Sequence, residues 1–187
     1  MISNIHKRTS LISVIIFIFL FLSVRVLFAE AVQIITDRQY YPQALLMIQN
    51  AKKTINLIMF EAAYYKKYPD SPSNELIREL IRARNRNVKV EVILEAMDKK
   101  QDRATQRNYQ TGKILSGKGV EVFYDSKDKT THAKVLIVDG ESILMGSANW
   151  TYHALVRNHE VNVLIKSPEQ AKKLITYFND IKLTTTK

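Results

Sequence analysis

Short apolar runs alternate in this chain with segments whose apolar residues recur every three to four positions, and this alternation constrains the fold most strongly. The apolar runs have the length of buried strands and occupy residues 32–36, 54–60, 88–94, 120–124, 133–138, 142–145 and 160–165. The helical pattern occupies residues 41–51, 73–81, 102–116 and 168–181. Helices and strands alternate first, and a pair of strands then interrupts them. The sequence therefore predicts one α/β domain with a mixed β-sheet and helices on both faces.

Turn residues mark two of the connections. Asp139-Gly140 separates two strand runs and is a strong signal for a β-hairpin. Residues 64–73 form a polar loop with two prolines, and Ser73 is suited to cap the helix that follows. The loop begins Tyr-Tyr-Lys-Lys-Tyr, a combination of rings and cations that suits single-stranded nucleic acid, with an ordinary surface loop as the alternative.

Residues 1–31 have a pattern distinct from the rest of the chain. Lys7 and Arg8 precede a nearly unbroken apolar run over residues 11–24, and Ala29-Glu30-Ala31 follows as a small-x-small site. This order is typical of a secretory signal peptide. The alternative is an uncleaved membrane anchor, although fourteen helical residues rise only about 21 Å against a hydrocarbon core of ~30 Å. We therefore expect residues 32–187 to be an exported domain, periplasmic or secreted, with membrane anchoring as the alternative.

Charge and cysteine content narrow the function classes. The 187 residues carry 28 Lys and Arg against 18 Asp and Glu, a net charge of +10. About +8 of this belongs to residues 32–187, because the leader holds three basic residues and one acidic residue. A basic domain favours a polyanionic partner such as nucleic acid or an anionic membrane surface. The chain has no cysteine, which excludes disulfides, thiolate zinc sites and a cysteine nucleophile.

Two pairs of residues with alternate spacing carry the predicted chemistry. His132 and Lys134 begin a strand, and their i, i+2 spacing places an imidazole beside an ammonium on one face. A cation next to an imidazole suits an anion better than a metal. Ser147 and Asn149 end the returning strand of the hairpin with the same spacing, so both are expected beside the first pair as hydrogen-bond donors to phosphate oxygens. Glu160 begins the next strand, where its carboxylate is placed to hold an imidazole by its second nitrogen.

These residues also form a recognisable motif. His-x-Lys-x(4)-Asp is written here as His132, Lys134 and Asp139, followed by Gly-Ser-Ala-Asn-Trp at residues 146–150 and Asn-His-Glu at residues 158–160. The pattern resembles the phospholipase D superfamily, and within it the small single-motif bacterial endonucleases of the Nuc type. The resemblance implies a phospholipase D-like fold and a phosphodiesterase that needs no metal or other cofactor and acts through a covalent phosphohistidine.

The resemblance also implies a role for each motif residue. His132 is the nucleophile, Lys134 and Asn149 bind the phosphate with help from Ser147, and Glu160 orients His132. Asp139 differs from these residues, because a turn residue is expected before Gly140 and its separation from His132 is out of phase on a strand. We therefore interpret Asp139 as structural.

Other residues near the motif are assigned to packing or to the surface. Trp150 is expected to pack under the site. His153 and His159 do not have ligand spacing with His132, so no metal site is predicted.

The number of motifs predicts the assembly. Chemistry of this family uses two histidines, one that attacks and one that protonates the leaving oxygen, whereas this chain has one motif and no room for a second copy. We therefore predict a homodimer whose motifs face each other across a twofold axis and share one active site.

Substrate choice stays open between two phosphodiesters. The charge of the domain favours DNA or RNA cut with little sequence preference, because phosphate contacts supply most of the affinity. The alternative is a phospholipase D that converts phospholipids such as phosphatidylcholine to phosphatidic acid. A third alternative is a domain that binds nucleic acid or an anionic membrane without turnover, against which the intact motif argues.

Overall fold

The structure is a computed structural model and describes residues 31–97, 102–126 and 129–185. The chain divides after Glu30, and the compact unit that begins at Ala31 contains every element described below. The predicted leader, residues 1–31, lies outside the described residues except for Ala31, so its signal or anchor role stays a prediction. In the three described stretches, no helix has the length and apolar character needed to span a bilayer.

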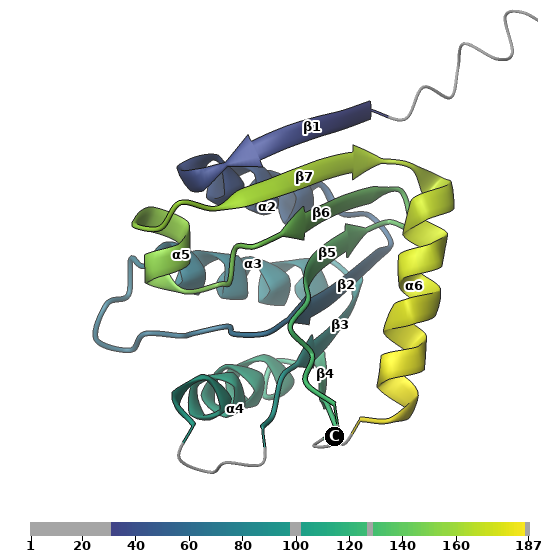
Figure 1. Cartoon of the computed structure of the whole chain (residues 1–187). Helices are drawn as coiled ribbons and strands as arrows, with labels where there is room; N and C mark the ends of the chain where they lie inside the picture. The colour runs from purple at the N-terminus through teal and green to yellow at the C-terminus, as the bar shows by residue number, and fades with distance from the viewer. Residues whose placement is uncertain (1–30, 98–101, 127–128, 186–187) are drawn as a thin grey trace, which may run out of the picture. The chain divides into compact units, whose positions relative to one another are not determined.

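One seven-stranded sheet, in the order β1-β7-β6-β5-β2-β3-β4, forms the centre of the unit (Figure 1). Its strands are β1 (Ala31–Thr36), β2 (Thr54–Met59), β3 (Lys89–Leu94), β4 (Glu121–Tyr124), β5 (Lys134–Val138), β6 (Ser142–Gly146) and β7 (Val161–Lys166). Strands β2, β3 and β4 are parallel to one another, whereas the pairs β2/β5, β5/β6, β6/β7 and β7/β1 are antiparallel. The predicted mixed sheet is confirmed.

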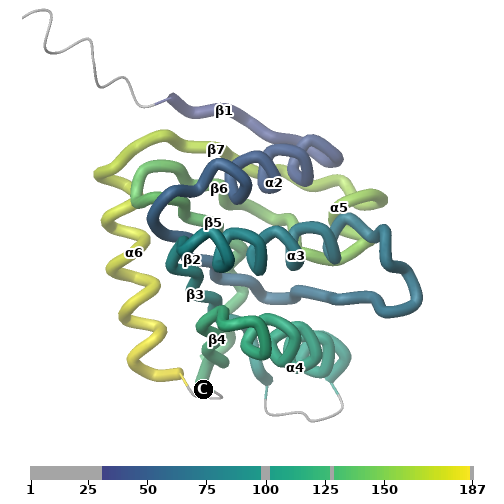
Figure 2. The backbone as a smooth tube through the Cα atoms, turned by 180° about the vertical axis from the view of Figure 1, so that it is seen from behind, coloured from purple at the N-terminus to yellow at the C-terminus, as the bar shows by residue number. Residues whose placement is uncertain are grey.

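Helices cover both faces of this sheet, as predicted (Figures 1 and 2). They are η2 (Asp37–Gln39), α2 (Tyr40–Asn50), α3 (Pro72–Asn85), α4 (Arg103–Ser116), α5 (Tyr152–Val156) and α6 (Pro168–Leu183). Helices α2 and α3 lie on one face, and the long helix α6 lies on the other against β2, β5 and β6.

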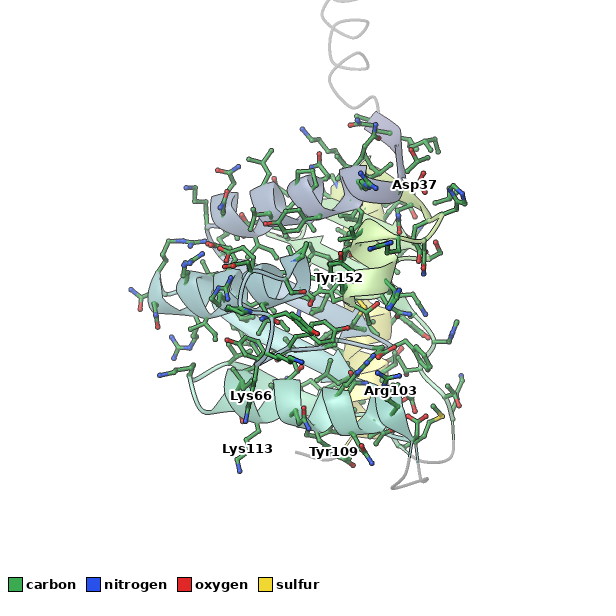
Figure 3. All side chains as sticks on the ribbon, turned by 90° about the vertical axis from the view of Figure 1, so that its left-hand side faces the viewer. Asp37, Lys66, Arg103, Tyr109, Lys113 and Tyr152 are labelled. Carbon is green, nitrogen blue, oxygen red and sulfur yellow. The ribbon has the colours of Figure 1, made fainter. Side chains whose placement is uncertain are left out.

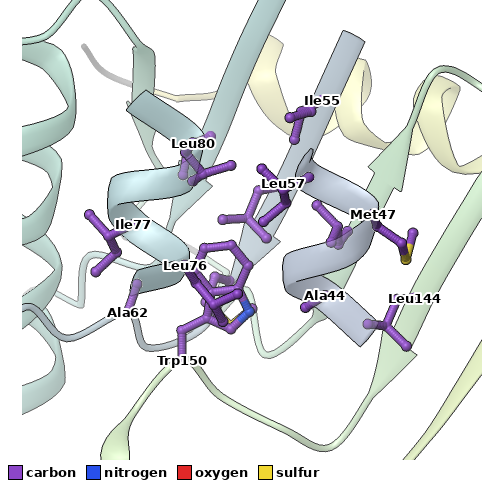
Figure 4. Close-up of a cluster of buried hydrophobic side chains, with 14 of the residues drawn as sticks. Ala44, Met47, Ile55, Leu57, Ala62, Leu76, Ile77, Leu80, Leu144 and Trp150 are labelled. Atoms are coloured by element: carbon purple, nitrogen blue, oxygen red, sulfur yellow. The ribbon is translucent and has the colours of Figure 1, made fainter. Parts of the chain in front are cut away.

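Strand alternation divides the core between the two faces. The larger cluster joins the sheet to α2 and α3 and contains Leu57, Leu76 and the fully buried Trp150 (Figure 4). The smaller cluster includes Ile58, the neighbour of Leu57, and Phe178 of α6. Consecutive residues of a central strand thus face opposite helix layers, which is why these strands are apolar at nearly every position.

Two helices begin at other residues than predicted, and the structure contains two short helical elements that were not predicted. The predicted cap of α3, Ser73, was wrong: Ser71 is the N-cap residue and Pro72 occupies the first turn, where its fixed φ favours helix initiation. Helix α2 begins at Tyr40, two residues before Pro42. The short elements η2 and α5 were not predicted, because one turn of helix shows no apolar periodicity.

Because of the strand directions, one end of each of the seven strands lies at the same edge of the sheet. Since β2, β3 and β4 run toward this edge and the remaining strands alternate, it collects the carboxyl ends of β1, β2, β3, β4 and β6 and the amino ends of β5 and β7. We call it the site edge. Its residues belong to segments far apart in the sequence, and Figure 3 looks directly at it.

Candidate active site

His132 and Lys134 meet at the start of β5, as predicted. Lys134 is buried, pairs with Met59 of β2, and donates from Nζ to the backbone carbonyl oxygen of His132 at 2.7 Å. The Nζ atom also lies 4.7 Å from the ring centroid of Phe60. The exposed imidazole of His132 contacts the same ring, with 4.5 Å between centroids. Phe60 is therefore a shared platform for the imidazole and the ammonium, and sequence reasoning did not identify it.

Burial and nearby carboxylates shift the pKa of Lys134 in opposite directions. Burial lowers the pKa of its ammonium, and the carboxylates of Glu160 and Glu61 partly offset this by favouring the charged form. The net direction is a lowered pKa. A cation that is partly stripped of water, and whose charged form two carboxylates favour, is well suited to bind an anionic phosphate oxygen.

Ser147 is fixed between β6 and β7. Its N–H donates to the carbonyl oxygen of Val161, and its Oγ accepts from the Val161 N–H, both at 3.1 Å. Gly146 before it approaches β7 so closely that a Cβ atom there would lie 2.4 Å from the same carbonyl oxygen. The glycine of the Gly-Ser-x-Asn motif is therefore required by strand packing, which in turn places Ser147.

Glu160 is buried and clamped at both its side chain and its backbone. Its carboxylate accepts from Ser147 Oγ and, at 3.0 Å, from Asn158 Nδ2. Its backbone N–H donates to Asp37 Oδ1 at 2.8 Å, and its carbonyl accepts from the Asp37 N–H at 2.9 Å. Asp37 is thus a positioning residue that the sequence did not reveal. The hydrogen bond that the Asp37 carboxylate accepts from the Glu160 N–H is the main cause that lowers the pKa of Asp37.

The expected hydrogen bond between Glu160 and His132 is not found among the described residues. The carboxylate binds Ser147 instead, because Ser147 directly follows the adjacent strand β6, whereas His132 precedes β5, one strand further away. The role of Glu160 in orienting His132 accordingly stays a prediction, and its observed contacts position Ser147.

Asn149 lies at the site edge between two anchored neighbours. The Ala148 N–H donates to Asn162 Oδ1 at 3.1 Å, and Trp150 is fully buried with its Nε1 donating to Tyr40 Oη at 3.0 Å. The expectation that Trp150 packs under the site is confirmed. Asn149 Oδ1 is buried and has no hydrogen-bond partner among the described residues. The Nδ2 group of the same carboxamide is the donor that could contact a phosphate oxygen.

Asp139 lies at the opposite end of β5 from His132. Its carboxylate accepts the backbone N–H groups of Lys52, Lys53 and Thr54 at 2.7–3.2 Å. Burial acts to raise its pKa, but these hydrogen bonds outweigh burial and hold the pKa below its ordinary value. The position and contacts agree with the structural role predicted from the turn.

Three buried residues fix the backbone just before His132. Thr131 donates from its N–H to the carboxylate of Glu95 and from its Oγ1 to the carboxylate of Asp125. Burial, with a contribution from Asp125, raises the pKa of Glu95. Sequence reasoning missed these acids, although each directly follows a strand predicted to be buried, which was an available signal.

The described residues hold no group of three or more histidine, aspartate and glutamate side chains placed to bind a metal ion. His159 is fully exposed, and its Nδ1 lies 3.6 Å from Asp37 Oδ2. His153 belongs to a separate cavity described below.

This sheet carries His-x-Lys at the start of one strand and Gly-Ser-x-Asn at the end of the next, which is the arrangement expected of a phospholipase D-like fold. The chain belongs to the phospholipase D superfamily: residues 45–182 match the family described as "Cardiolipin synthase, PLD-like domain".

Relatives and solved structures agree with this membership. The chain is 32% identical over 125 residues to the mitochondrial cardiolipin hydrolase of Xenopus laevis, and 31% identical over 115 residues to a phospholipase D of Rickettsia typhi. These matches cover 67% and 62% of the chain, which spans about half the length of each relative, 52% and 53%.

Two bacterial proteins share the fold. The phospholipase D family member Nuc from Salmonella typhimurium matches with a TM-score of 0.70 at 22% identity, over 84% of this chain and 97% of Nuc. NucT from Helicobacter pylori matches with a TM-score of 0.67 at 16% identity, over 84% of this chain and 99% of NucT.

Proposed function

We propose that the chain is an exported phosphodiesterase that hydrolyses nucleic acid through a phosphohistidine on His132. The observation that carries the proposal is the exposed imidazole of His132 beside the buried ammonium of Lys134, both on Phe60. The leader pattern of residues 1–31 supports export.

In the proposed reaction, an imidazole nitrogen of His132 attacks the phosphorus atom and displaces one ester oxygen. The leaving oxygen takes a proton from His132 of the partner subunit. Water then attacks the phosphohistidine, and the same partner imidazole accepts the proton from the water. Lys134 and Asn149 contact the non-bridging oxygens and stabilise the charge that develops on them, with Ser147 assisting.

A twofold dimer would supply the second histidine, and an uncovered apolar strip on β1 and β7 supports this assembly. Val32, Ile34 and Val161 are 61%, 58% and 61% exposed, and strand pairing places all three on the face of α6. Helix α6 packs on β2, β5 and β6 and leaves this strip open. Val161 hydrogen-bonds Ser147, so the strip continues to the site edge, and a second copy of the chain would cover both together.

The net charge of about +8 outside the leader favours nucleic acid as the substrate. Phospholipid is the second candidate, favoured by the relatives named mitochondrial cardiolipin hydrolase and phospholipase D. The same pocket serves both, because both substrates are phosphodiesters.

The test compares single-stranded DNA, duplex DNA, RNA and phosphatidylcholine vesicles in the presence of EDTA. We expect the nucleic acids to be cleaved and the activity to disappear in His132→Ala, whose exposed side chain leaves the fold intact. Loss of activity on chelation would contradict the metal-free mechanism, and substantial activity in His132→Ala would exclude His132 as the nucleophile. Turnover confined to the vesicles would favour the phospholipase.

A further inference from the structure

A second binding feature adjoins the candidate active site. A cavity of about 650 Å³ opens between the loop after β2, the start of α4 and the start of α5. Its lining includes three tyrosines and three basic residues: Tyr65, Tyr68, Tyr152, Lys67, Arg103 and Arg107. The volume is within the range of about 300–1,000 Å³ typical of small-molecule sites.

The loop that forms this cavity is held by buried polar side chains. Asn74, fully buried, accepts the Tyr65 N–H at 2.7 Å and donates to the carbonyls of Tyr65 and Tyr68 at 3.0 and 2.9 Å. Thr111 of α4 accepts the Tyr64 N–H at 3.1 Å. The tyrosines are therefore presented on a fixed backbone, which reduces the entropy lost when a ligand binds.

Rings and cations are interleaved within the lining. The Arg107 guanidinium lies 5.5 Å from the ring centroid of Tyr65, and the Tyr65 hydroxyl accepts the Tyr152 N–H at 3.3 Å. Tyr68 is 60% exposed, with Lys67 Nζ 5.8 Å from its ring centroid. Flat surfaces and positive charges thus alternate, an arrangement that matches the alternating bases and phosphates of a nucleic acid strand.

Two connections join the cavity to the reacting centre. Arg107 pairs with the Glu61 carboxylate at 2.6 Å, and Glu61 follows Phe60, the platform for His132 and Lys134. Tyr152 lies three residues after Asn149. In the view of Figure 3, Tyr152 lies between Asp37 and Arg103. Asp37 is hydrogen-bonded to Glu160, and Arg103 lines the cavity.

We propose that this cavity binds an unpaired nucleotide adjacent to the scissile phosphate, with its base stacked on Tyr68 and neighbouring tyrosines and its phosphate held by Lys67, Arg103 and Arg107. The inference rests on the proposed function and deepens it, because a base can enter only when it is not stacked within a duplex. The chain therefore prefers single strands. Among the described lining residues, Pro69 is the only aliphatic one and the other apolar surface comes mainly from the tyrosine rings, while Asp70 supplies an acceptor for base amino groups.

The binding test uses the full chain carrying His132→Ala, which blocks cleavage, and fluorescein-labelled oligothymidine of about twelve nucleotides. An abasic strand of the same length keeps the phosphates and lacks the bases. Fluorescence anisotropy should give a dissociation constant roughly 5- to 100-fold lower for oligothymidine than for the abasic strand. A ratio near one would overturn the proposal and indicate phosphate contacts alone.

The variant test removes one ring at a time. Tyr68→Ala should reduce the ratio of oligothymidine to abasic affinity by about fivefold or more. Tyr177→Ala removes an exposed tyrosine of α6, outside the cavity lining, and should leave the ratio unchanged. Tyr152→Ala tests a second wall of the cavity and should act like Tyr68→Ala. Equal ratios in all three variants would overturn the proposal, as would displacement of oligothymidine by phosphatidylcholine vesicles that depends on Tyr68.

Failure of this inference is distinguishable from failure of the proposed function. Bis(p-nitrophenyl) phosphate is a phosphodiester without bases, so its hydrolysis by the unmodified chain in EDTA reports the reacting centre alone. Hydrolysis together with equal binding of abasic and normal strands would refute the cavity and leave the phosphodiesterase standing. An absence of hydrolysis would refute the phosphodiesterase itself.

Discussion

At the scale of single residues, the site depends on how strongly Lys134 keeps its charge. Burial favours the neutral amine, and Glu160 is the first of the two carboxylates that oppose this. Glu160 thus has two effects, since it also accepts from Ser147 Oγ. A neutral side chain of the same shape separates the electrostatic effect from the positional one.

Glu160→Gln should move the alkaline limit of activity to lower pH. Glu160 raises the pKa of Lys134, so its neutralisation lowers that pKa further and the ammonium is lost at a lower pH. An opposite charge at close range shifts a pKa by about one to three units, so a downward movement of about one pH unit is expected. The measurement is kcat/KM against pH with bis(p-nitrophenyl) phosphate. Glu121→Gln, at an exposed position of β4, is the control, and an identical profile for both variants would contradict the coupling.

Asp139→Asn should destabilise the fold at neutral pH and much less in acid. The folded pKa of Asp139 is lowered, so its contribution to stability is complete above the unfolded value of about 3.9 and disappears as the pH falls through the folded value. Loss of charged hydrogen bonds to three backbone N–H groups should cost about 1–3 kcal/mol at pH 7. Asn tolerates the positive φ of 56° at this position. Urea unfolding at pH 7 and pH 3 measures the difference, with exposed Asp180→Asn as control; an equal loss at both pH values would contradict this assignment.

The residue positions that the sequence predicted correctly are those set by strand alternation. The i, i+2 spacing brought His132 and Lys134 together because alternation is a property of every strand. The partner of Glu160 was not predictable in the same way. It depends on the register between β6 and β7, where Gly146 pairs with Asn162, and local sequence does not specify that register.

At the scale of elements, helix α4 connects the ends of the parallel strands β2 and β3 to the loop that follows β2. Asn108 of α4 is fully buried, accepts the Ala62 N–H at 2.8 Å, and donates to the carbonyls of Phe60 and Glu95 at 2.7 and 2.9 Å. One side chain thus satisfies three backbone groups where the chain leaves β2 and β3. These backbone groups belong to or adjoin Phe60, which supports His132, and Glu95, which binds Thr131.

Asn108→Ala should therefore lower both stability and activity. Three buried backbone groups would lose their partner, at a cost of roughly 2–5 kcal/mol, or a decrease in Tm of about 5–15 °C. Differential scanning calorimetry measures the change. Asn179→Ala, at an exposed position of α6, should stay within about 0.5 kcal/mol of the unmodified chain. Equal melting temperatures for the two variants would show that solvent replaces Asn108 without cost.

Element boundaries were predictable where long apolar patterns defined them. The seven predicted strands and four long helices are all present, and most of them bury several residues in the two core layers, although β1 buries only Ile35. The short helix α5 depends on a single cap, in which Thr151 Oγ1 accepts the Ala154 N–H at 3.2 Å. A cap of this kind gives a short helix no distinguishing pattern in the sequence, although α5 contributes Tyr152 to the cavity.

At the scale of the whole molecule, one chain carries one His-x-Lys motif and an exposed apolar strip that reaches its site edge. The proposed reaction needs a second imidazole, and a second copy of the chain could cover the strip. A single twofold contact would satisfy both requirements. The assembly and the chemistry are therefore tested by the same experiment.

Mixed dimers should show whether two histidines act on one phosphate. When the unmodified chain and His132→Ala are co-expressed in equal amounts and pair at random, roughly one dimer in four contains two intact histidines. A shared site then gives about a quarter of the specific activity per total chain, whereas independent sites give about half. Light scattering verifies that the mixture is dimeric, and differently tagged chains isolate the mixed species, which should be inactive. Half of the full activity in that purified species would show that each His132 works alone and would end the argument for a shared site.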